Sequence, residues 1–316
     1  SFKAFRENIH KPRGWSFKTW FADRVAMHAL VCGNLIITGE HGFRFVSSID
    51  STHRIQIVHA AMKEIFRSLK KDYPDLQLFF IKEQSDIGDQ SAGDFLVNQG
   101  FYRFHVQPKM IFKVNDSWLR MDDYLDGLKS KYRLRMKRAK ARLQPIQAVN
   151  LDQDKIEKEH QVIFELFQQV VDEADFHMVD LLPEYFVRLK ENMGDAFQMR
   201  AYYLEGQMIG FISYLEDNES LYAHFTGFRR NLNESHDLYL NILLDLIETS
   251  IEKKLTILDL SRTALEIKSS VGAVPHRMLG YLKHDRPFYN FLLSRIFTFF
   301  YPGKAWNQRN PFKAIS

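Results

Sequence analysis

The sequence has 316 residues, 45% of them hydrophobic and 14% aromatic, which is enough apolar material for one large or two medium-sized cores and excludes a disordered chain. Its 43 Lys and Arg residues against 39 Asp and Glu residues give a net charge of +4, too mild to favour any class of partner by itself. A single cysteine, Cys32, excludes an internal disulfide framework and a cysteine-based zinc site, and it favours a reducing cytoplasm.

The first half of the chain reads as one α/β unit. The start of the sequence lacks the apolar segment of a secretory signal, and no later stretch contains the ~20 consecutive apolar residues that a membrane span needs. Apolar stretches at 30–39 and 40–45 carry turn glycines, which predicts a strand pair with tight turns. Apolar residues recur at three- and four-residue spacing from Ile55 to Leu69, which predicts a helix with one buried face. There follow a predicted strand at 76–82, a polar loop at 83–93, a short helix that ends at Gly100 and a strand at 105–114.

The most polarised segment of the chain is residues 129–142. It contains eight positive and no negative side chains, with apolar residues such as Tyr132 and Met136 on one side, so we expect a helix that packs by its apolar stripe and turns a cationic face outward. Two interpretations stay open. The segment is either a solvated linker helix or a surface for the phosphates of a cofactor, an RNA or a membrane headgroup, because eight unpaired cations repel one another. The candidate anion-binding residues are Arg133, Arg135, Lys137 and Arg138.

The second half repeats the order of elements of the first. A predicted helix at 157–172 leads into an acidic stretch that holds Glu173, Asp175 and His177. The elements predicted after it are strands at 201–215 and 221–229, a helix at 236–254, a strand at 256–260, a polar elbow at 261–263, a helix that ends at Gly272 and a strand at 277–283.

The shared order of elements at 30–114 and 211–283 predicts two related α/β domains in tandem. We place the first at residues 1–145, including the basic helix, and the second at residues 146–316, which we expect to carry the active cleft. Residue identity between the copies is negligible, so this prediction depends on the order of elements alone. In such a unit the reactive surface lies where the carboxyl ends of the strands splay apart.

A family resemblance is carried by residues 259–281. Asp259-Leu260-Ser261-Arg262-Thr263, followed by Lys268, Gly272 and Tyr281, resembles the Asp-Phe-Gly-Arg/Ser … Phe-Lys … Gly … Tyr signature of the FemAB-like branch of the GNAT-fold acyltransferases. The basic segment also resembles the cationic helix that those proteins place between two GNAT-like halves. The spacing matches while several identities differ. We therefore predict an α/β fold of two tandem GNAT-like domains with mixed sheets, a basic helical connection and a C-terminal aromatic helix.

The resemblance implies transfer of an acyl or aminoacyl group from an acyl-CoA thioester or an aminoacyl-tRNA to a primary amine, without a metal. Backbone amides on a splayed strand, here 221–228 beside 255–260, would bind the donor carbonyl and stabilise the oxyanion of a tetrahedral intermediate. No nucleophilic serine or cysteine is then needed, so a sequential mechanism follows. The turn after the splayed strand contains Arg229 and Arg230 but no glycines to cradle a CoA pyrophosphate, which leaves room for a donor borne by tRNA or a carrier.

The candidate site residues lie on the splayed strand, in the acidic stretch and at the elbow. His224 or one of the acids Glu173 and Asp175 is predicted as the base, and a core histidine is the alternative interpretation of His224. Alternation along the strand places His224 on one face with Tyr222 and Thr226. The predicted donor- or acceptor-binding residues are Tyr222, Thr226, Arg229, Arg230, Ser261, Arg262, Lys268 and His177. The twelve histidines show no spacing that groups with carboxylates as a metal site.

The C-terminal stretch 287–301 is apolar nearly all round and is flanked by Arg286 and Lys304. It predicts a helix that either docks on its own domain or lies in the interface of an anionic membrane, so a peripheral contact with the inner face of a membrane stays open. The rival to an enzyme is a GNAT-scaffold module that has lost catalysis and binds nucleic acid or an anionic membrane surface.

Overall fold

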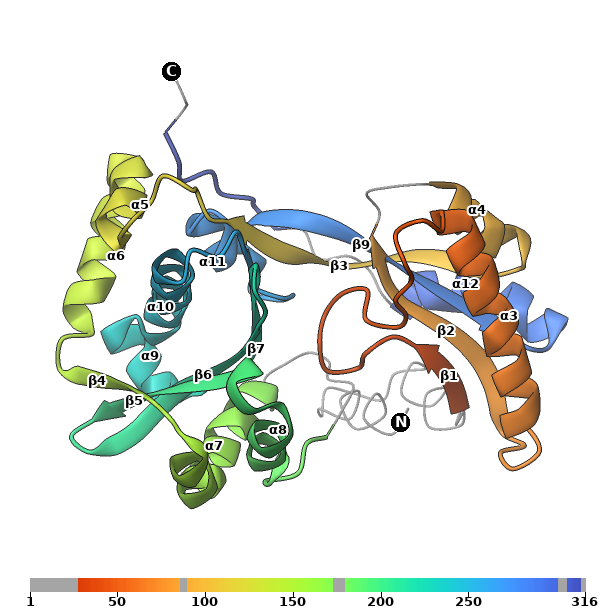
Figure 1. The fold of residues 1–316 in the computed structure, drawn as a ribbon, viewed down its shortest axis with the longest axis horizontal. Helices are drawn as coiled ribbons and strands as arrows, with labels where there is room; N and C mark the ends of the chain where they lie inside the picture. Colours follow the sequence, from red (N-terminus) through yellow and green to blue (C-terminus); the bar gives the residue numbers. More distant parts are fainter. Residues whose placement is uncertain (1–27, 86–89, 173–179, 301–305, 314–316) are drawn as a thin grey trace. The chain divides into compact units, whose positions relative to one another are not determined.

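The computed structural model describes residues 28–85, 90–172, 180–300 and 306–313 (Figure 1). Contacts divide the chain into two compact units. Unit 1 is built from Ser1–Lys109, Asp175–Asp180 and His276–Ala305, and unit 2 from Met110–Ala174, Leu181–Pro275 and Trp306–Ser316. This division differs from the expected boundary at residue 145, because the basic helix packs within unit 2 and the chain after residue 275 returns to unit 1.

Unit 1 is a small mixed sheet covered by helices. Its strands are β1 (His28–Cys32), β2 (Leu76–Ser85), the first part of β3 (Tyr102–Lys113) and most of β9 (Val274–His284); its helices are α3 (Ser51–Leu69), α4 (Gln90–Asn98) and α12 (Pro287–Phe300). β1 pairs with β2 in parallel, and β2 pairs with β9 in antiparallel orientation. The predicted helix from Ile55 to Leu69 is confirmed as α3, which buries Ile55 and Met62 among its core residues.

The strand pair predicted at 30–45 is wrong, because only β1 forms there and residues 33–50 contain no strand. Gly33 and Gly39 have φ angles of 149° and 124°, in the region that glycine enters readily. The backbone amide of Gly39 donates to the carboxylate of Glu83 at 2.7 Å, and the amide of Ser85 donates to Glu40. These backbone groups are therefore satisfied by side-chain carboxylates instead of a neighbouring strand.

Unit 2 is a six-stranded sheet in the order β3-β8-β7-β6-β5-β4. The strands are β4 (Ile146–Asn150), β5 (Phe197–Leu204), β6 (Gln207–Glu216), β7 (Ser220–Phe228), β8 (Ile257–Asp259) and the end of β3. The helices are α5 (Met121–Gly127), α6 (Ser130–Arg142), α7 (Gln153–Val171), α8 (Tyr185–Met193), α9 (Arg230–His236), α10 (Leu238–Glu252) and α11 (Leu265–Ser270), with a 3₁₀ turn at Gly194–Ala196. All neighbouring strands in this part of the sheet are antiparallel except β7 and β8, which are parallel. The mixed α/β class predicted from the sequence is thus confirmed.

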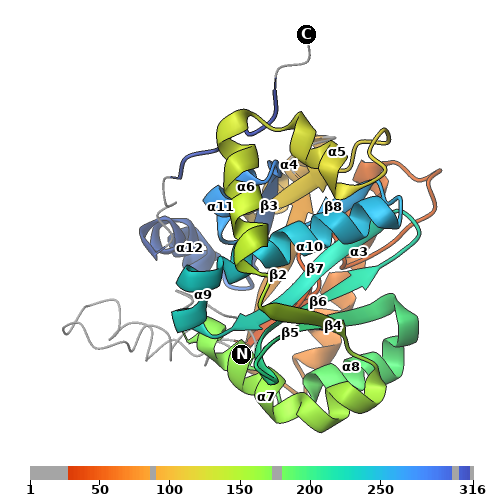
Figure 2. The ribbon, with the colours of Figure 1, turned by 90° about the vertical axis from the view of Figure 1, so that its left-hand side faces the viewer.

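Helices cover both faces of the unit 2 sheet (Figure 2). Ile212 and Tyr214 of β6 belong to the core that contains α10, whereas Phe211, the residue just before Ile212, contacts Phe186 of α8 at a ring separation of 5.4 Å. Because successive strand residues point to opposite faces, α10 lies on one face of β6 and α8 on the other. α7 packs on β7 next to α8.

Two predicted elements of unit 2 are divided by residues with positive φ. The predicted strand 201–215 is a hairpin of β5 and β6 that turns at Glu205 and Gly206, with φ angles of 50° and 78°. The predicted helix 236–254 is interrupted at Asp237, whose φ of 48° separates α9 from α10. The helices and strands predicted at 129–142, 157–172, 256–260 and 277–283 are confirmed as α6, α7, β8 and β9.

The aromatic helix α12 docks on unit 1 through Leu293, which is buried with Leu78 of β2 and Leu282 of β9. Its first turns also present aromatic side chains to solvent, since Phe288 and Phe291 are 68% and 61% exposed. None of the helices that the structure describes is long and apolar enough to cross a membrane.

Candidate active site and cationic groove

β7 and β8 part after a short parallel ladder. They pair only at Ser220 with Ile257, Leu221 with Leu258 and Tyr222 with Asp259. β8 ends there, and the chain stays with β3, since the amide of Leu260 donates to the carbonyl of Met110 at 2.9 Å. β7 instead continues for six residues, paired with β6 on its other edge. The parting predicted for these two strands is therefore present, and no strand in the described part of the chain lies beside the edge of β7 from residue 223 to 228.

The elbow after β8 holds a strained backbone. Ser261, Thr263 and Ala264 have φ angles of 61°, 65° and 46°, which side chains other than glycine enter at a cost of about 1–3 kcal/mol each. Asp259 braces the turn, because its Oδ1 accepts the amide of Ser261 at 2.8 Å. Such clusters of strained residues are typical of functional sites, which agrees with the polar elbow singled out in the sequence.

Lys268 is buried beneath this elbow, only 4% exposed. Its Nζ donates to the carbonyl oxygen of Arg262 at 2.6 Å. Burial lowers the pKa of Lys268 to about 7, although the nearby carboxylate of Asp259 acts in the opposite direction. The structure thus brings Lys268, one of the predicted binding residues, together with Asp259 and Arg262.

His224 lies in an aromatic cluster on the side of β7 that faces α8. Its Nε2 is 3.1 Å from the hydroxyl of Tyr185 and its Nδ1 is 3.1 Å from the hydroxyl of Ser213. The strict alternation predicted along this strand is broken at His224, since its ring and that of the next residue, Phe225, have centroids only 4.2 Å apart. The pairing of β6 with β7 shifts register at Ser213, which explains this. There the backbone amide of Phe225 donates to the hydroxyl of Ser213, and this hydroxyl, in place of a backbone group, donates to the carbonyl of Phe225.

Burial lowers the pKa of His224 to about 3, so its imidazole is neutral at physiological pH. A group with so low a pKa takes up a proton poorly, which makes it an inefficient general base near pH 7. The geometry around His224 is that of a neutral hydrogen-bonding residue held between two hydroxyl groups.

The other predicted site residues are spread around this region. The hydroxyl of Tyr222 donates to Asp217 Oδ2 at 3.0 Å, and the hydroxyl of Thr226 donates to the carbonyl of Phe211 at 2.8 Å. Arg229 and Arg230 are exposed at the start of α9, directly after β7. The predicted residues Glu173, Asp175 and His177 lie outside the described residues.

A groove of about 750 Å³ runs between α6 and α11. Four cations of α6 line it at helical spacing, together with the junction of α9 and α10, one face of α11 and the segment after residue 305. The lining residues are Lys131, Tyr132, Leu134, Arg135, Arg138, Arg142, Asp237, Glu266, Ile267, Ser270 and Arg309. Of the predicted anion-binding residues, Arg135 and Arg138 belong to the groove. Arg133 pairs with Asp126 at 3.4 Å instead, and Lys137 is not among the lining residues.

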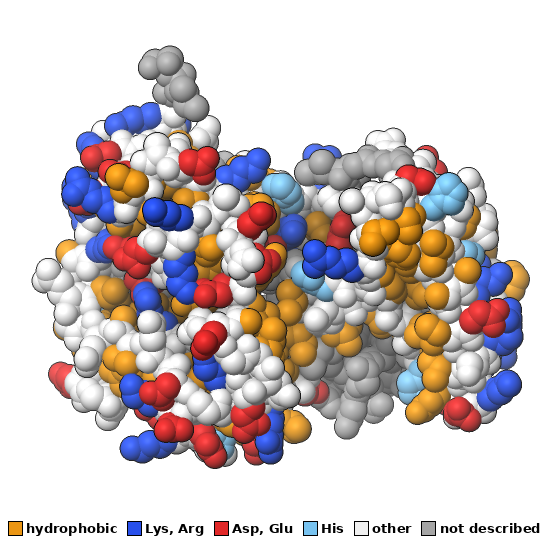
Figure 3. Space-filling view, in the orientation of Figure 1, with side chains coloured by type: hydrophobic (Ala, Val, Ile, Leu, Met, Phe, Trp, Pro, Cys, Tyr) orange, Lys and Arg blue, Asp and Glu red, His pale blue; other side chains and the backbone are white. Residues whose placement is uncertain are grey.

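The cationic face of α6 is partly neutralised by distant carboxylates. Lys140 pairs with Glu248 at 3.0 Å and Arg142 with Asp237 at 2.8 Å. Over the part of unit 2 visible in Figure 3, basic and acidic side chains are interspersed in the same way. The premise that all eight cations are unpaired was therefore wrong, because the carboxylates that pair with Lys140 and Arg142 lie 108 and 95 residues further along the sequence. Within the part of the chain that the structure describes, no carboxylate pairs with Lys131 or Arg138.

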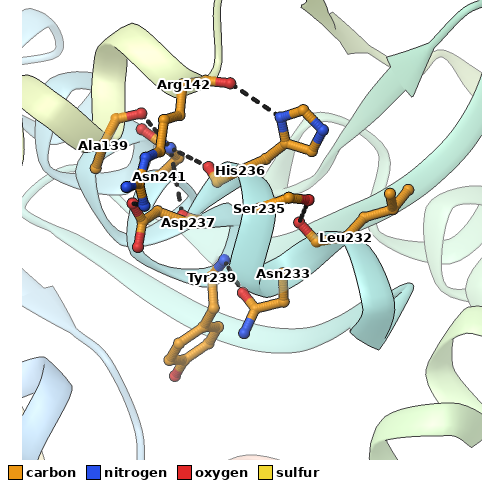
Figure 4. Close-up of polar contacts among 9 residues, drawn as sticks. All are labelled: Ala139, Arg142, Leu232, Asn233, Ser235, His236, Asp237, Tyr239 and Asn241. Carbon is orange, nitrogen blue, oxygen red and sulfur yellow. Dashed lines mark hydrogen bonds and ion pairs between the residues drawn. The ribbon is translucent and has the colours of Figure 1, made fainter.

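A hydrogen-bonded joint fixes the end of α6 against α9 and α10 (Figure 4). The side-chain nitrogen Nδ2 of Asn241 donates to the carbonyls of Ala139 and His236, at 2.8 and 3.0 Å. The Nδ1 of His236 lies 3.1 Å from the carbonyl oxygen of Arg142. The hydroxyl of Ser235 donates back to the carbonyl of Leu232 at 3.2 Å. This joint holds Arg142 and Asp237 as the end wall of the groove.

The opposite wall is made by α11 and the C-terminal segment. Glu266 accepts the guanidinium of Arg309 and the amide of Asn307, each at 3.1 Å, and the amide of Arg309 donates to Ser269 Oγ at 3.0 Å. Both acidic residues of the groove, Glu266 and Asp237, are thus paired with arginines. The positive charge of Lys131, Arg135 and Arg138 remains in excess, which is the electrostatic condition for binding an anionic group.

The family model described as FemAB-like, peptidoglycan biosynthesis/recognition, matches residues 37–277, well over half of the chain. The chain belongs to the FemAB-like family. Its fold is similar to that of FemX, with a TM-score of 0.53 and 10% sequence identity over 87% of this chain and 82% of FemX. No match was found among curated proteins.

Two further solved structures share less of the fold with this FemAB-like chain. One is L-PGS from Bacillus licheniformis, with a TM-score of 0.48 and 12% identity over 74% of this chain and 77% of that protein. The other is a tandem GNAT protein from the clavulanic acid biosynthesis pathway, with a TM-score of 0.47 and 15% identity over 72% of this chain and 70% of that protein. The family assignment supports an acyl- or aminoacyltransferase.

Proposed function

We propose that this FemAB-like protein is an N-acyltransferase that moves an acyl or aminoacyl group from an ester or thioester donor to a primary amine. The observation that carries this proposal is the parting of β7 from β8 after Tyr222 and Asp259, directly beside the strained elbow. The donor carbonyl would lie along the uncovered edge of β7, where backbone amides stabilise the developing oxyanion. Two related domains in tandem, each built on such a unit, remain part of the proposal.

In this reaction the amine nitrogen attacks the donor carbonyl carbon, and the bond from that carbon to the ribose oxygen or thiol sulfur breaks. The leaving atom takes up the proton that the amine loses, so the products are the amide and a free ribose hydroxyl or thiol. The ammonium form of Lys268, beneath the elbow, adds positive charge near the developing oxyanion. We assign removal of the amine proton to Glu173 or Asp175, because the low pKa of His224 makes it a poor base. His224 and Tyr222 then serve to shape the acceptor side.

The groove favours a donor borne by RNA. Lys131, Arg135, Arg138 and Arg142 extend over twelve residues of α6, and the eleven steps from first to last span about 16 Å at 1.5 Å per residue. Such a row suits successive phosphates of a nucleic acid strand better than one pyrophosphate. The donor would therefore be an aminoacyl-tRNA, with acyl-CoA as its competitor, and an amine-bearing molecule would be the acceptor.

A transfer assay tests this proposal. Purified protein is incubated with aminoacyl-tRNA or with acyl-CoA in the presence of a panel of primary amines, and amide products are measured by mass spectrometry. The expected result is an amide from aminoacyl-tRNA at a rate above that of the protein-free control. Incubation with donor alone should leave the protein unmodified, because the mechanism has no covalent intermediate. Acylated protein would contradict the sequential mechanism.

A second candidate function is a FemAB-like module that binds nucleic acid or an anionic membrane surface without catalysis. It is favoured because the hydroxyls of Tyr222 and Thr226 already donate hydrogen bonds to Asp217 and to the carbonyl of Phe211, and because His224 is a weak base. The exposed Phe288 and Phe291 of α12 would provide the membrane contact. This candidate predicts salt-sensitive binding of tRNA with no amide product in the transfer assay.

A further inference from the structure

Unit 1 contains a second basic pocket, which the proposed transfer reaction does not use. It has a volume of about 550 Å³ and lies between α3, β2 and the end of β9. Its floor is aromatic: Phe66 and Phe79 stack with ring centroids 4.0 Å apart, and Phe101 lies at 6.3 Å from Phe79. The lining residues are His59, Lys63, Phe66, Arg67, Lys70, Lys71, Phe79, Phe101, Lys283 and Asp285.

The rim of this pocket carries an excess of positive charge. Lys70 is paired with Asp285, the one carboxylate that lines the pocket, and Arg67 is paired with Glu64 at 2.6 Å. In the described ranges of unit 1, neither Lys63 nor Lys71 has a carboxylate partner, and the Nζ of Lys283 bonds only to a neutral group, the carbonyl of Gln99, at 2.6 Å. Three ammonium groups therefore surround the opening without a counter-charge.

His59 is the buried polar group of the pocket, 7% exposed and packed against the rings of Phe95 and Phe101. Among the residues that the structure describes, its partners are these aromatic rings, and none forms a hydrogen bond with its ring nitrogens. Burial lowers the pKa of His59, and the charges of Lys283 and Lys63 lower it further. Burial and then Lys63 also lower the pKa of Lys283. An anion placed between His59 and Lys283 would stabilise the protonated forms of both side chains.

We propose that this pocket binds the phosphate group of a phosphate ester whose apolar or planar part lies on the aromatic floor. A terminal phosphate offers three strong acceptor oxygens, which matches the three ammonium groups of Lys63, Lys71 and Lys283 better than a carboxylate does. The neutral ring of His59 adds one donor at the base of the pocket. The aromatic floor gives an ester an advantage over free phosphate because it buries the attached group. This site is independent of the transfer proposed for unit 2.

Binding of three probes tests this proposal: inorganic phosphate, a nucleoside monophosphate, and phosphatidylcholine vesicles with and without phosphatidic acid. The test variant is the double substitution Lys63→Gln and Lys71→Gln. The matched control is Lys155→Gln with Lys158→Gln, which removes the same charge from exposed positions of α7 in unit 2. Affinities come from calorimetry for the soluble probes and from co-sedimentation for the vesicles.

The expected result is that one of the two esters binds more tightly than inorganic phosphate and loses about tenfold or more in affinity in the Lys63 and Lys71 variant, with no change in the control. The nucleotide and vesicle arms then tell a soluble ester from a lipid headgroup. The imidazole resonances of His59 should shift when the preferred ester is added. Equal affinity for all probes, equal weakening in both variants, or no binding at all would overturn the proposal.

Discussion

The elbow after β8 and the groove beside α6 are both polar, and α11 contributes to each, yet they are held together by different forces. Lys268 on one side of α11 is buried and bonded to backbone, under a turn with three left-handed residues. Glu266 on another side is exposed and paired with Arg309. The elbow therefore depends on packing and exact geometry, whereas the groove depends on net charge. Substitutions should damage the first severely and the second gradually.

The largest expected effect is the loss of transfer in Lys268→Met. In the proposed reaction Lys268 adds positive charge near the developing oxyanion, so its removal should lower kcat by about 10²- to 10³-fold, with little change in the KM for the donor. The assay is the transfer reaction, with Lys158→Met as a control for loss of an exposed lysine. A kcat within twofold of the parent protein would assign Lys268 a purely structural role.

The same lysine predicts how stability depends on pH. Because burial lowers the pKa of Lys268 from 10.5 to about 7, the unfolded chain binds more protons than the folded protein between pH 7 and pH 10. The contribution of Lys268 to the free energy of unfolding should therefore rise with pH over this range. Urea denaturation at pH 7 and pH 9.5 should show a smaller rise in Lys268→Met than in the parent protein. Equal rises in both would contradict the buried, weakly basic lysine.

The next largest effect is expected at Gly272, which ends the turn after α11. Its φ is 110°, and an added Cβ would lie 2.3 Å from the ring of Phe312. Gly272→Ala should lower the free energy of unfolding by about 2–4 kcal/mol, through strain and displacement of the ring. Gly194→Ala is the matched control, since its φ is 52° but no atom of the described residues lies within 4 Å of the added Cβ, so it should cost about 1–2 kcal/mol. Similar losses in both variants would show that the Phe312 contact is unimportant.

In the groove, Lys131→Gln combined with Arg138→Gln should weaken binding of tRNA by about tenfold at moderate salt. The slope of log affinity against log salt concentration should fall by about 1 to 2. Thermal stability should be unchanged, because neither residue pairs with a carboxylate in the described structure. Lys155→Gln with Lys158→Gln again serves as the control. A salt slope unchanged from that of the parent protein would remove the groove from the proposed donor site.

The smallest effect is expected at the joint between α6 and α10. The ion pair of Arg142 and Asp237 is partly exposed, so Arg142→Gln should change the free energy of unfolding by less than about 1 kcal/mol. A loss well above this value in chemical denaturation would mean that the joint, like the elbow, depends on its geometry.

Much of the fold follows from hydrophobic periodicity, as α3, α6 and α7 show, because a helix with one buried face repeats in the sequence. The places where predicted helices and strands are interrupted do not follow from hydrophobic periodicity. The left-handed Asp237 and the side-chain hydrogen bonds of Ser213 depend on groups that meet only in the folded chain.

The candidate site also has features that the sequence predicts and features that it does not. The parting of β7 from β8 and the polar elbow could be predicted from the order of elements and the motif at Asp259. The groove residues Lys131 and Arg142 lie four residues before and seven residues after Arg135, a predicted anion-binding residue, so helical spacing alone could have predicted them. Arg309 could not be found in this way, because it reaches the groove from the far end of the chain. The burial of Lys268 likewise results from packing that no local pattern reports.

Hydrogen exchange of β7 with a non-hydrolysable aminoacyl-tRNA analogue tests the central claim most directly. If the donor carbonyl lies on the uncovered edge of β7, the peptide that covers residues 222–228 should exchange more slowly when the analogue is bound, together with peptides of α6. Slower exchange in α6 without any change in β7 would show that the groove holds RNA but that the parted strands do not hold the donor, and it would contradict the transferase.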